Sequence, residues 1–106
     1  MLRSVGKSPV AEQGEDPRVA ELGTAVARLR RELAVYRSEF RDRAIAEDEL
    51  AALAAMVASG SPETPRMRRS LLLIVGSIGS VSALRPALMG VRSAVDLFGD
   101  VPRRPL

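Results

Sequence analysis

The feature that most constrains the fold is a regular spacing of apolar residues between positions 19 and 40. The spacing alternates between three and four residues without a gap, which predicts one apolar seam along a helix with a heptad repeat. The seam residues are Val19, Leu22, Val26, Leu29, Leu33, Tyr36 and Phe40. Asp16 followed by Pro17 is typical of a helix start, because aspartate caps a free N–H and proline has none to lose. The sequence therefore predicts a helix over about residues 17–41.

The seam is three heptads long and has two interpretations. Across a parallel dimer, Glu32 of one chain would face Arg37 of the other, which is an attractive pair in a coiled coil. The same seam is also able to pack against the rest of its own chain. We therefore treat the seven seam residues as a candidate dimer interface. If these residues form a dimer interface, replacing both Leu29 and Leu33 with glutamate should abolish the oligomer.

Two further helices are predicted in the middle of the chain. Residues 44–59 have apolar residues at helical spacing and stop at Gly60, a residue suited to a left-handed helix end. Residues 65–78 follow Thr64, which together with Pro65 repeats the cap-then-proline pattern. This third helix is apolar most of the way round, which indicates burial on more than one side, inside the domain or against a partner.

A fourth helix is predicted over residues 82–98, with Ser82 as its cap and Pro86 in the first turn, where proline is tolerated. The sequence thus predicts an all-α fold, a four-helix bundle-like arrangement of two helical hairpins in one domain, residues 17–99. Residues 1–16 and 100–106 lack a sustained apolar period and are expected to be flexible. The predicted core comprises Leu22, Val26, Leu29, Leu33, Tyr36, Leu50, Leu53, Val57, Leu71, Ile74, Val75, Ile78, Leu84, Leu88, Val91, Val95 and Phe98.

Composition removes most catalytic chemistry. The 106 residues include no His and no Cys, which excludes imidazole relays, thiol nucleophiles, disulfides and zinc sites of the Cys/His type. The acidic run Glu47, Asp48 and Glu49 consists of successive helical residues, which point in different directions and do not converge on one atom. We therefore expect no enzymatic activity, no metal and no cofactor.

Positive charge gathers in two arginine clusters, on a chain of formal net charge +3. Candidate nucleic-acid or anion contacts are Arg28, Arg30 and Arg31 on the first helix and Arg66, Arg68 and Arg69 at the start of the third. The fourth helix carries few polar side chains, whereas a recognition helix needs many to read bases. Nucleic-acid binding of the nucleoid type is therefore an alternative function and not the leading one.

Membrane insertion is not favoured. The longest uncharged stretch, residues 70–84, would span about 22 Å as a helix, less than the ~30 Å of a hydrocarbon core. The first sixteen residues contain no apolar run of the kind that a secretory signal needs. We therefore expect a cytoplasmic protein, with peripheral membrane attachment through the third helix as a second alternative.

Residues 68–84, RRSLLLIVGSIGSVSAL, followed by residues 91–99, carry a resemblance. The chain resembles short Ala- and Arg-rich actinobacterial proteins of uncharacterised function over about residues 17–99. The shared pattern is helical and apolar and contains no functional residues. The resemblance therefore implies a GC-rich actinobacterial origin and a helical fold, and leaves the function open.

The leading functional hypothesis combines these features. Strong apolar patterning in so short a chain favours self-association, which covers residual apolar surface. We predict a non-catalytic helical protein–protein interaction module, most simply a homodimer, that acts as a scaffold or small regulator. A different protein partner is left open.

Overall fold

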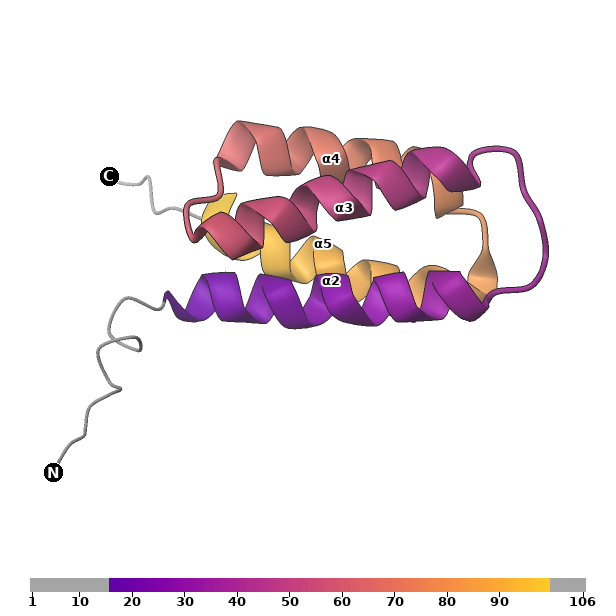
Figure 1. Cartoon of the computed structure of the whole chain (residues 1–106), viewed down its shortest axis with the longest axis horizontal. Helices are drawn as coiled ribbons and strands as arrows, with labels where there is room; N and C mark the ends of the chain where they lie inside the picture. The colour runs from indigo at the N-terminus through magenta and orange to yellow at the C-terminus, as the bar shows by residue number, and fades with distance from the viewer. Residues whose placement is uncertain (1–15, 100–106) are drawn as a thin grey trace, which may run out of the picture.

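A computed structural model describes residues 16–99, in which four α-helices are joined by short connections (Figure 1). The helices are α2 (Pro17–Val35), α3 (Arg43–Ser59), α4 (Thr64–Ile78) and α5 (Arg85–Gly99), and a short 3-10 helix, η1 (Ser82–Leu84), leads into α5. Successive helices run in opposite directions, so the chain forms two helical hairpins. The predicted all-α, four-helix fold is confirmed. The predicted flexible segments, apart from Asp16, lie outside the described residues.

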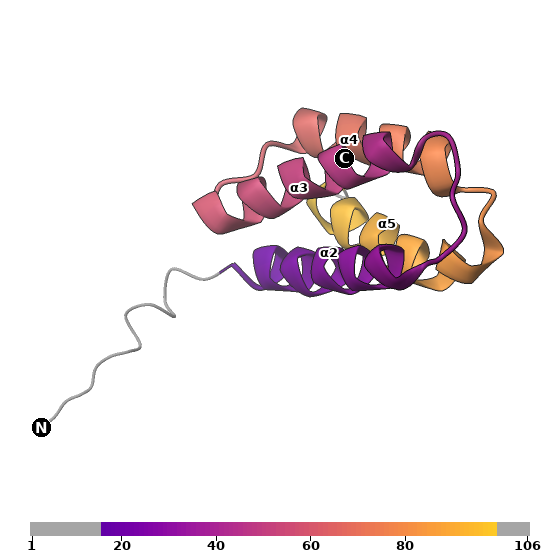
Figure 2. The same ribbon diagram turned by 45° about the vertical axis from the view of Figure 1, so that its right-hand side comes forward.

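The four helices form a ring in sequence order. Both α2 and α4 pack against α3 and α5, so α2 and α4 occupy opposite corners, as Figures 1 and 2 show. Each helix turns one apolar side to the centre, where a single core forms. Its buried apolar residues are Val19, Leu22, Val26, Leu29, Leu33, Ala46, Leu50, Leu53, Met67, Ile74, Ile78, Leu84, Ala87, Leu88, Val91, Ala94, Val95 and Phe98.

The start of α2 follows the sequence prediction. Asp16 is the N-cap, and its carboxylate accepts a hydrogen bond of 2.9 Å from the backbone N–H of Arg18. The Arg18 guanidinium pairs with the same carboxylate at 2.8 Å, and these hydrogen bonds hold the pKa of Asp16 below its ordinary value. That guanidinium also lies 4.8 Å from the centre of the Phe98 ring on α5. The cap therefore also joins α2 to α5.

The end of α2 differs from the prediction, because the helix stops at Val35 and does not continue to residue 41. The physical reason is Arg43, the first residue of α3, whose guanidinium donates hydrogen bonds to the backbone carbonyls of Leu33 and Tyr36. The same guanidinium lies 5.6 Å from the centre of the Phe40 ring. Arg43 thus satisfies carbonyls at the end of α2 that a continuing helix would have used, and it holds the connection to α3.

The other helix ends lie within three residues of the predicted ones, and α3 begins at Arg43 and α5 ends at Gly99, each one residue beyond the predicted range. Gly60 ends α3 in the left-handed conformation at φ 76°, as expected. Helix α4 begins one residue earlier than predicted, with Glu63 and not Thr64 at the N-cap position. The fourth helical segment opens as η1 at residue 82 and becomes α-helical only at Arg85, with Val81 and not Ser82 preceding it.

The core departs from the prediction mainly in α4. Val75 is 41% exposed, because the buried stripe of α4 runs through Met67, Ser70, Ile74 and Ile78. Tyr36, Val57 and Leu71, also predicted to be core, are only partly buried and pack against its edge. The third helix is therefore buried on one side, and its other apolar side chains face outward.

Candidate functional site

The predicted seam lies inside the domain. Its first five residues, from Val19 to Leu33, are buried in the core that α2 shares with α3 and α5. Tyr36 and Phe40 follow the end of α2, where they are partly buried and their rings meet edge-on, 5.9 Å apart. A dimer built on this seam would have to open the bundle. Five of the seven candidate interface residues thus belong to the core of this fold, and Tyr36 and Phe40 pack against its edge.

Exposed apolar surface lies on the outer side of α4 and not along the predicted seam. Leu72 is 71% exposed, and Leu73 and Val75 are about equally exposed at 40% and 41%. Leu72 and Val75 lie together on the α5 side of the helix, whereas Leu73 lies on the α3 side. Large apolar side chains gathered on one exposed helix side indicate an interaction site, whereas isolated ones are ordinary. The sequence indicated a surplus of apolar residues on this helix. Which side would be exposed depends on how the neighbouring helices pack, and the pattern does not contain that information.

A groove of about 470 Å³ runs between α4 and α5. Apolar side chains line its α4 side, and charged ones of both signs border it. The lining residues are Arg68, Leu71, Leu72, Val75, Arg92 and Asp96. The Arg68 guanidinium also lies against Gly99, in the space that a side chain at position 99 would occupy. This groove combines an apolar centre with a charged border, a composition typical of protein interfaces.

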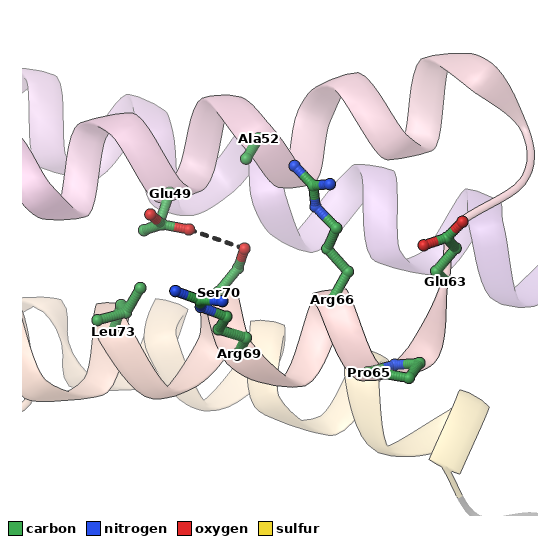
Figure 3. Close-up of a pocket in the computed structure, with 8 residues that line it drawn as sticks. All are labelled: Glu49, Ala52, Glu63, Pro65, Arg66, Arg69, Ser70 and Leu73. Atoms are coloured by element: carbon green, nitrogen blue, oxygen red, sulfur yellow. Dashed lines mark hydrogen bonds between the residues drawn. The ribbon is translucent and has the colours of Figure 1, made fainter.

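A second groove, of about 660 Å³, separates α3 from the first half of α4 (Figure 3). Its lining is mostly polar, with Glu49 on α3, Glu63 at the start of α4, and Arg66 and Arg69 on α4. The Ser70 hydroxyl donates a 2.8 Å hydrogen bond to the Glu49 carboxylate, which ties the two helices together, and Ser70 is only 3% exposed. Figure 3 shows Arg66 extending from α4 toward α3 near Ala52. Acidic and basic side chains are therefore mixed along this groove.

The two arginine clusters do not form one surface. Arg28, Arg30 and Arg31 lie on α2, and Arg66, Arg68 and Arg69 on α4, at the opposite corner of the bundle. Within the clusters the side chains are also divided between different surroundings. Arg28 pairs with Glu32 at 3.0 Å, and Arg30 lines the α2–α3 surface beside Glu47.

On α4, Arg66 and Arg69 line the α3 side, whereas Arg68 lines the α5 side. The six candidate anion contacts thus belong to at least three separate faces. A basic stripe, the usual electrostatic footprint of nucleic-acid binding, is not assembled from them.

Two other kinds of site are absent from the described part of the chain. Between residues 16 and 99, no group of three or more His, Cys, Asp or Glu side chains is placed to hold a metal ion. None of the helices in that range has both the length and the apolar character that crossing a membrane requires. The α4–α5 groove is the candidate functional site because exposed apolar side chains and charges of both signs meet there.

Comparison with known proteins places the chain in a family and adds no activity. No curated protein and no solved structure gives a significant match to the chain. A protein-family model matches residues 11–99, which is most of the chain. That range includes all four helices. The chain therefore belongs to the DUF5955 family, a family of unknown function.

Proposed function

We propose that this protein is a non-catalytic helical interaction module that self-associates and acts as a scaffold or small regulator. The observation that carries the proposal is the exposed apolar side of α4 beside α5, where Leu72 and Val75 face outward from a domain with a complete core of its own. Because exposed apolar groups of this kind lower the free energy of the system when they are buried, a partner surface is favoured.

The charges around this surface support a protein partner over the two alternatives. Nucleic-acid binding depends on a concentration of Lys and Arg against phosphates, but Arg66 and Arg69 share their groove with Glu49 and Glu63. Helices that lie on anionic membranes carry mainly basic side chains on the polar face, but Asp96 borders the α4–α5 groove. Mixed charge around an apolar centre fits a protein surface best.

The test is the absolute mass of the full chain by size-exclusion chromatography with light scattering, at low and at high salt. At about 100 µM, where a complex with a micromolar Kd is formed, we expect twice the 11.4 kDa of one chain at both salt concentrations. An apolar interface resists salt, whereas an association held by surface charges weakens with it. A single-chain mass under both conditions would contradict self-association.

Two binding assays test the alternatives directly. Gel retardation at low salt should show no complex with double-stranded DNA or RNA, and flotation with anionic vesicles should leave the protein unbound. Retardation that fades steeply with salt would favour the nucleic-acid hypothesis. The cytoplasmic location and the actinobacterial origin stay predictions of the sequence.

A further inference from the structure

We propose that the partner surface is the α4–α5 face and that its occupant is a second copy of this chain, related by a two-fold axis. This inference rests on the proposed self-association and adds the face, the partner and the charge pairing. The face is defined by Leu72 and Val75 on α4 and by Arg92 and Asp96 on α5, together with Arg68 at its edge.

The apolar centre of the face is accessible and continuous. Leu72 is the most exposed large apolar side chain of α4, and it lies with Leu71 and Val75 along one groove. Met89, one turn before Arg92 on α5, is also 44% exposed. In a two-fold interface every residue is used twice, so Leu72 of each copy would enter the groove of the other.

The charges on the face point to a second copy. A two-fold interface brings one patch against itself, so a patch of one sign would repel its own copy. Here Arg68 and Arg92 are accompanied by Asp96, so either arginine of one copy can pair with Asp96 of the other. None of these three side chains takes part in an ion pair within residues 16–99. Their charges are therefore available to a partner.

The α3–α4 groove is less suited to a second copy. Its apolar contribution on α4 is Leu73, which is less exposed than Leu72, and the Glu49 carboxylate is already engaged by Ser70. Leu73 is next to Leu72 in sequence and lies on the other side of the same helix. It therefore provides a matched control for any substitution at Leu72.

The first experiment compares Leu72→Glu with Leu73→Glu in the full chain, by light scattering and sedimentation equilibrium. We expect Leu72→Glu to weaken dimerisation on the order of 100-fold, because two leucines leave the interface. Leu73→Glu should leave the dimerisation constant within about threefold of the parent value, because Leu73 lies outside the proposed interface. A threefold change corresponds to less than about 1 kcal/mol in the free energy of dimerisation. Circular dichroism checks that each variant is still helical.

The second experiment exchanges the charges of the face. Asp96→Arg makes all three border charges positive, and the double variant Arg68→Asp with Arg92→Asp makes them negative. Each variant alone should be monomeric at concentrations where the parent chain is dimeric, because its copies repel each other. An equimolar mixture should recover a two-chain mass. If Arg68→Asp disturbs folding through its contact with Gly99, Arg68→Gln combined with Arg92→Asp replaces it and still leaves only negative charge on the face.

The outcomes separate this inference from the proposed function. A parent chain that is monomeric contradicts both self-association and the assigned face. A dimeric parent that Leu72→Glu does not weaken, or that Leu73→Glu weakens equally, overturns the α4–α5 face and leaves self-association standing. A mixture of folded charge variants that stays monomeric overturns the pairing of Asp96 with the arginines.

Discussion

Helices α2 and α4 lie at opposite corners of the bundle and use their apolar residues in opposite ways. In α2 the apolar stripe is narrow and regular, and all five of its residues within the helix are buried. In α4 the apolar residues surround much of the helix, and only part of them reaches the core. The regular stripe of α2 is thus buried within its own chain, whereas α4 leaves large apolar side chains exposed.

This difference bears on how an apolar seam should be interpreted in a short chain. A heptad spacing shows that one side of a helix is covered, but it does not tell whether the cover is intramolecular. A helix at the corner of a four-helix ring has only two neighbours, so one apolar stripe is enough to cover its buried side. Apolar residues beyond that stripe therefore indicate exposed apolar surface more directly than the seam does. For this protein the excess on α4 points outward, at Leu72, Leu73 and Val75.

The strongest test of the comparison truncates one leucine on each helix. Leu29 is fully buried in α2, so Leu29→Ala should lower the free energy of unfolding by about 2–5 kcal/mol. Leu72→Ala should change it by no more than about 0.5 kcal/mol when measured on dilute, monomeric protein. Urea denaturation followed by circular dichroism measures both. Equal losses would mean that Leu72 is as buried as Leu29.

The same reasoning changes the expectation for glutamate at Leu29 and Leu33. Both side chains lie in the core, so two buried carboxylates should unfold the monomer and not merely dissociate an oligomer. Loss of the helical circular dichroism signal distinguishes unfolding from dissociation.

A second, smaller effect is expected where α2 ends. Arg43→Ala removes a side chain that is only 18% exposed and that donates to the carbonyls of Leu33 and Tyr36. We expect the free energy of unfolding to fall by about 1–2 kcal/mol, because carbonyls at the helix end lose charged donors. Arg41→Ala, at an exposed position in the same connection, is the matched control and should be nearly neutral.

Hydrogen exchange sharpens this prediction. Amides from residue 33 to residue 43 should exchange faster in Arg43→Ala than in the parent chain, while those of α4 keep their protection. Uniformly faster exchange in all four helices would show that Arg43 supports the whole bundle and not this one helix end.

The smallest effect concerns pH and the other end of α2. The pKa of Asp16 is lowered by its hydrogen bonds with Arg18, so the ionised carboxylate stabilises the folded state. This stabilisation is present above the unfolded pKa and is lost as the pH falls through the lower, folded pKa. Asp16→Asn should therefore reduce the melting temperature slightly at neutral pH, and the difference should vanish in strong acid. A difference that grows in acid would contradict the assigned sign.

The sequence predicted the number and type of the helices because local signals mark them. Asp16 with Pro17 opens α2, and Gly60 closes α3, through chemistry that acts within a few residues. The end of α2 was predicted wrongly because the three-four spacing continues through Tyr36 and Phe40 after the helix has stopped. The residue that ends the helix, Arg43, acts across ten positions on Leu33, and periodicity does not report such a contact.

The candidate site was less accessible to sequence reasoning. The surplus of apolar residues on the third helix was visible, but Val75 was assigned to the core and Ser70 was not. These two positions lie on different sides of α4, and their burial depends on where α3 and α5 are placed around it. The groove unites α4 residues with Arg92 and Asp96, about twenty positions further along the chain. Only tertiary packing brings them together.

The ring order of the helices also has a consequence for how the chain folds. The α2–α3, α3–α4 and α4–α5 interfaces join neighbours in sequence, so each can form as a local hairpin. The α2–α5 interface joins the two ends of the domain, and its closure must bring together segments that are fifty to eighty residues apart in sequence. The conformational entropy that the chain loses in this closure is offset only when the core contacts are complete. We therefore expect docking of α5 onto α2 to be the step that makes the hairpins fold as one cooperative domain.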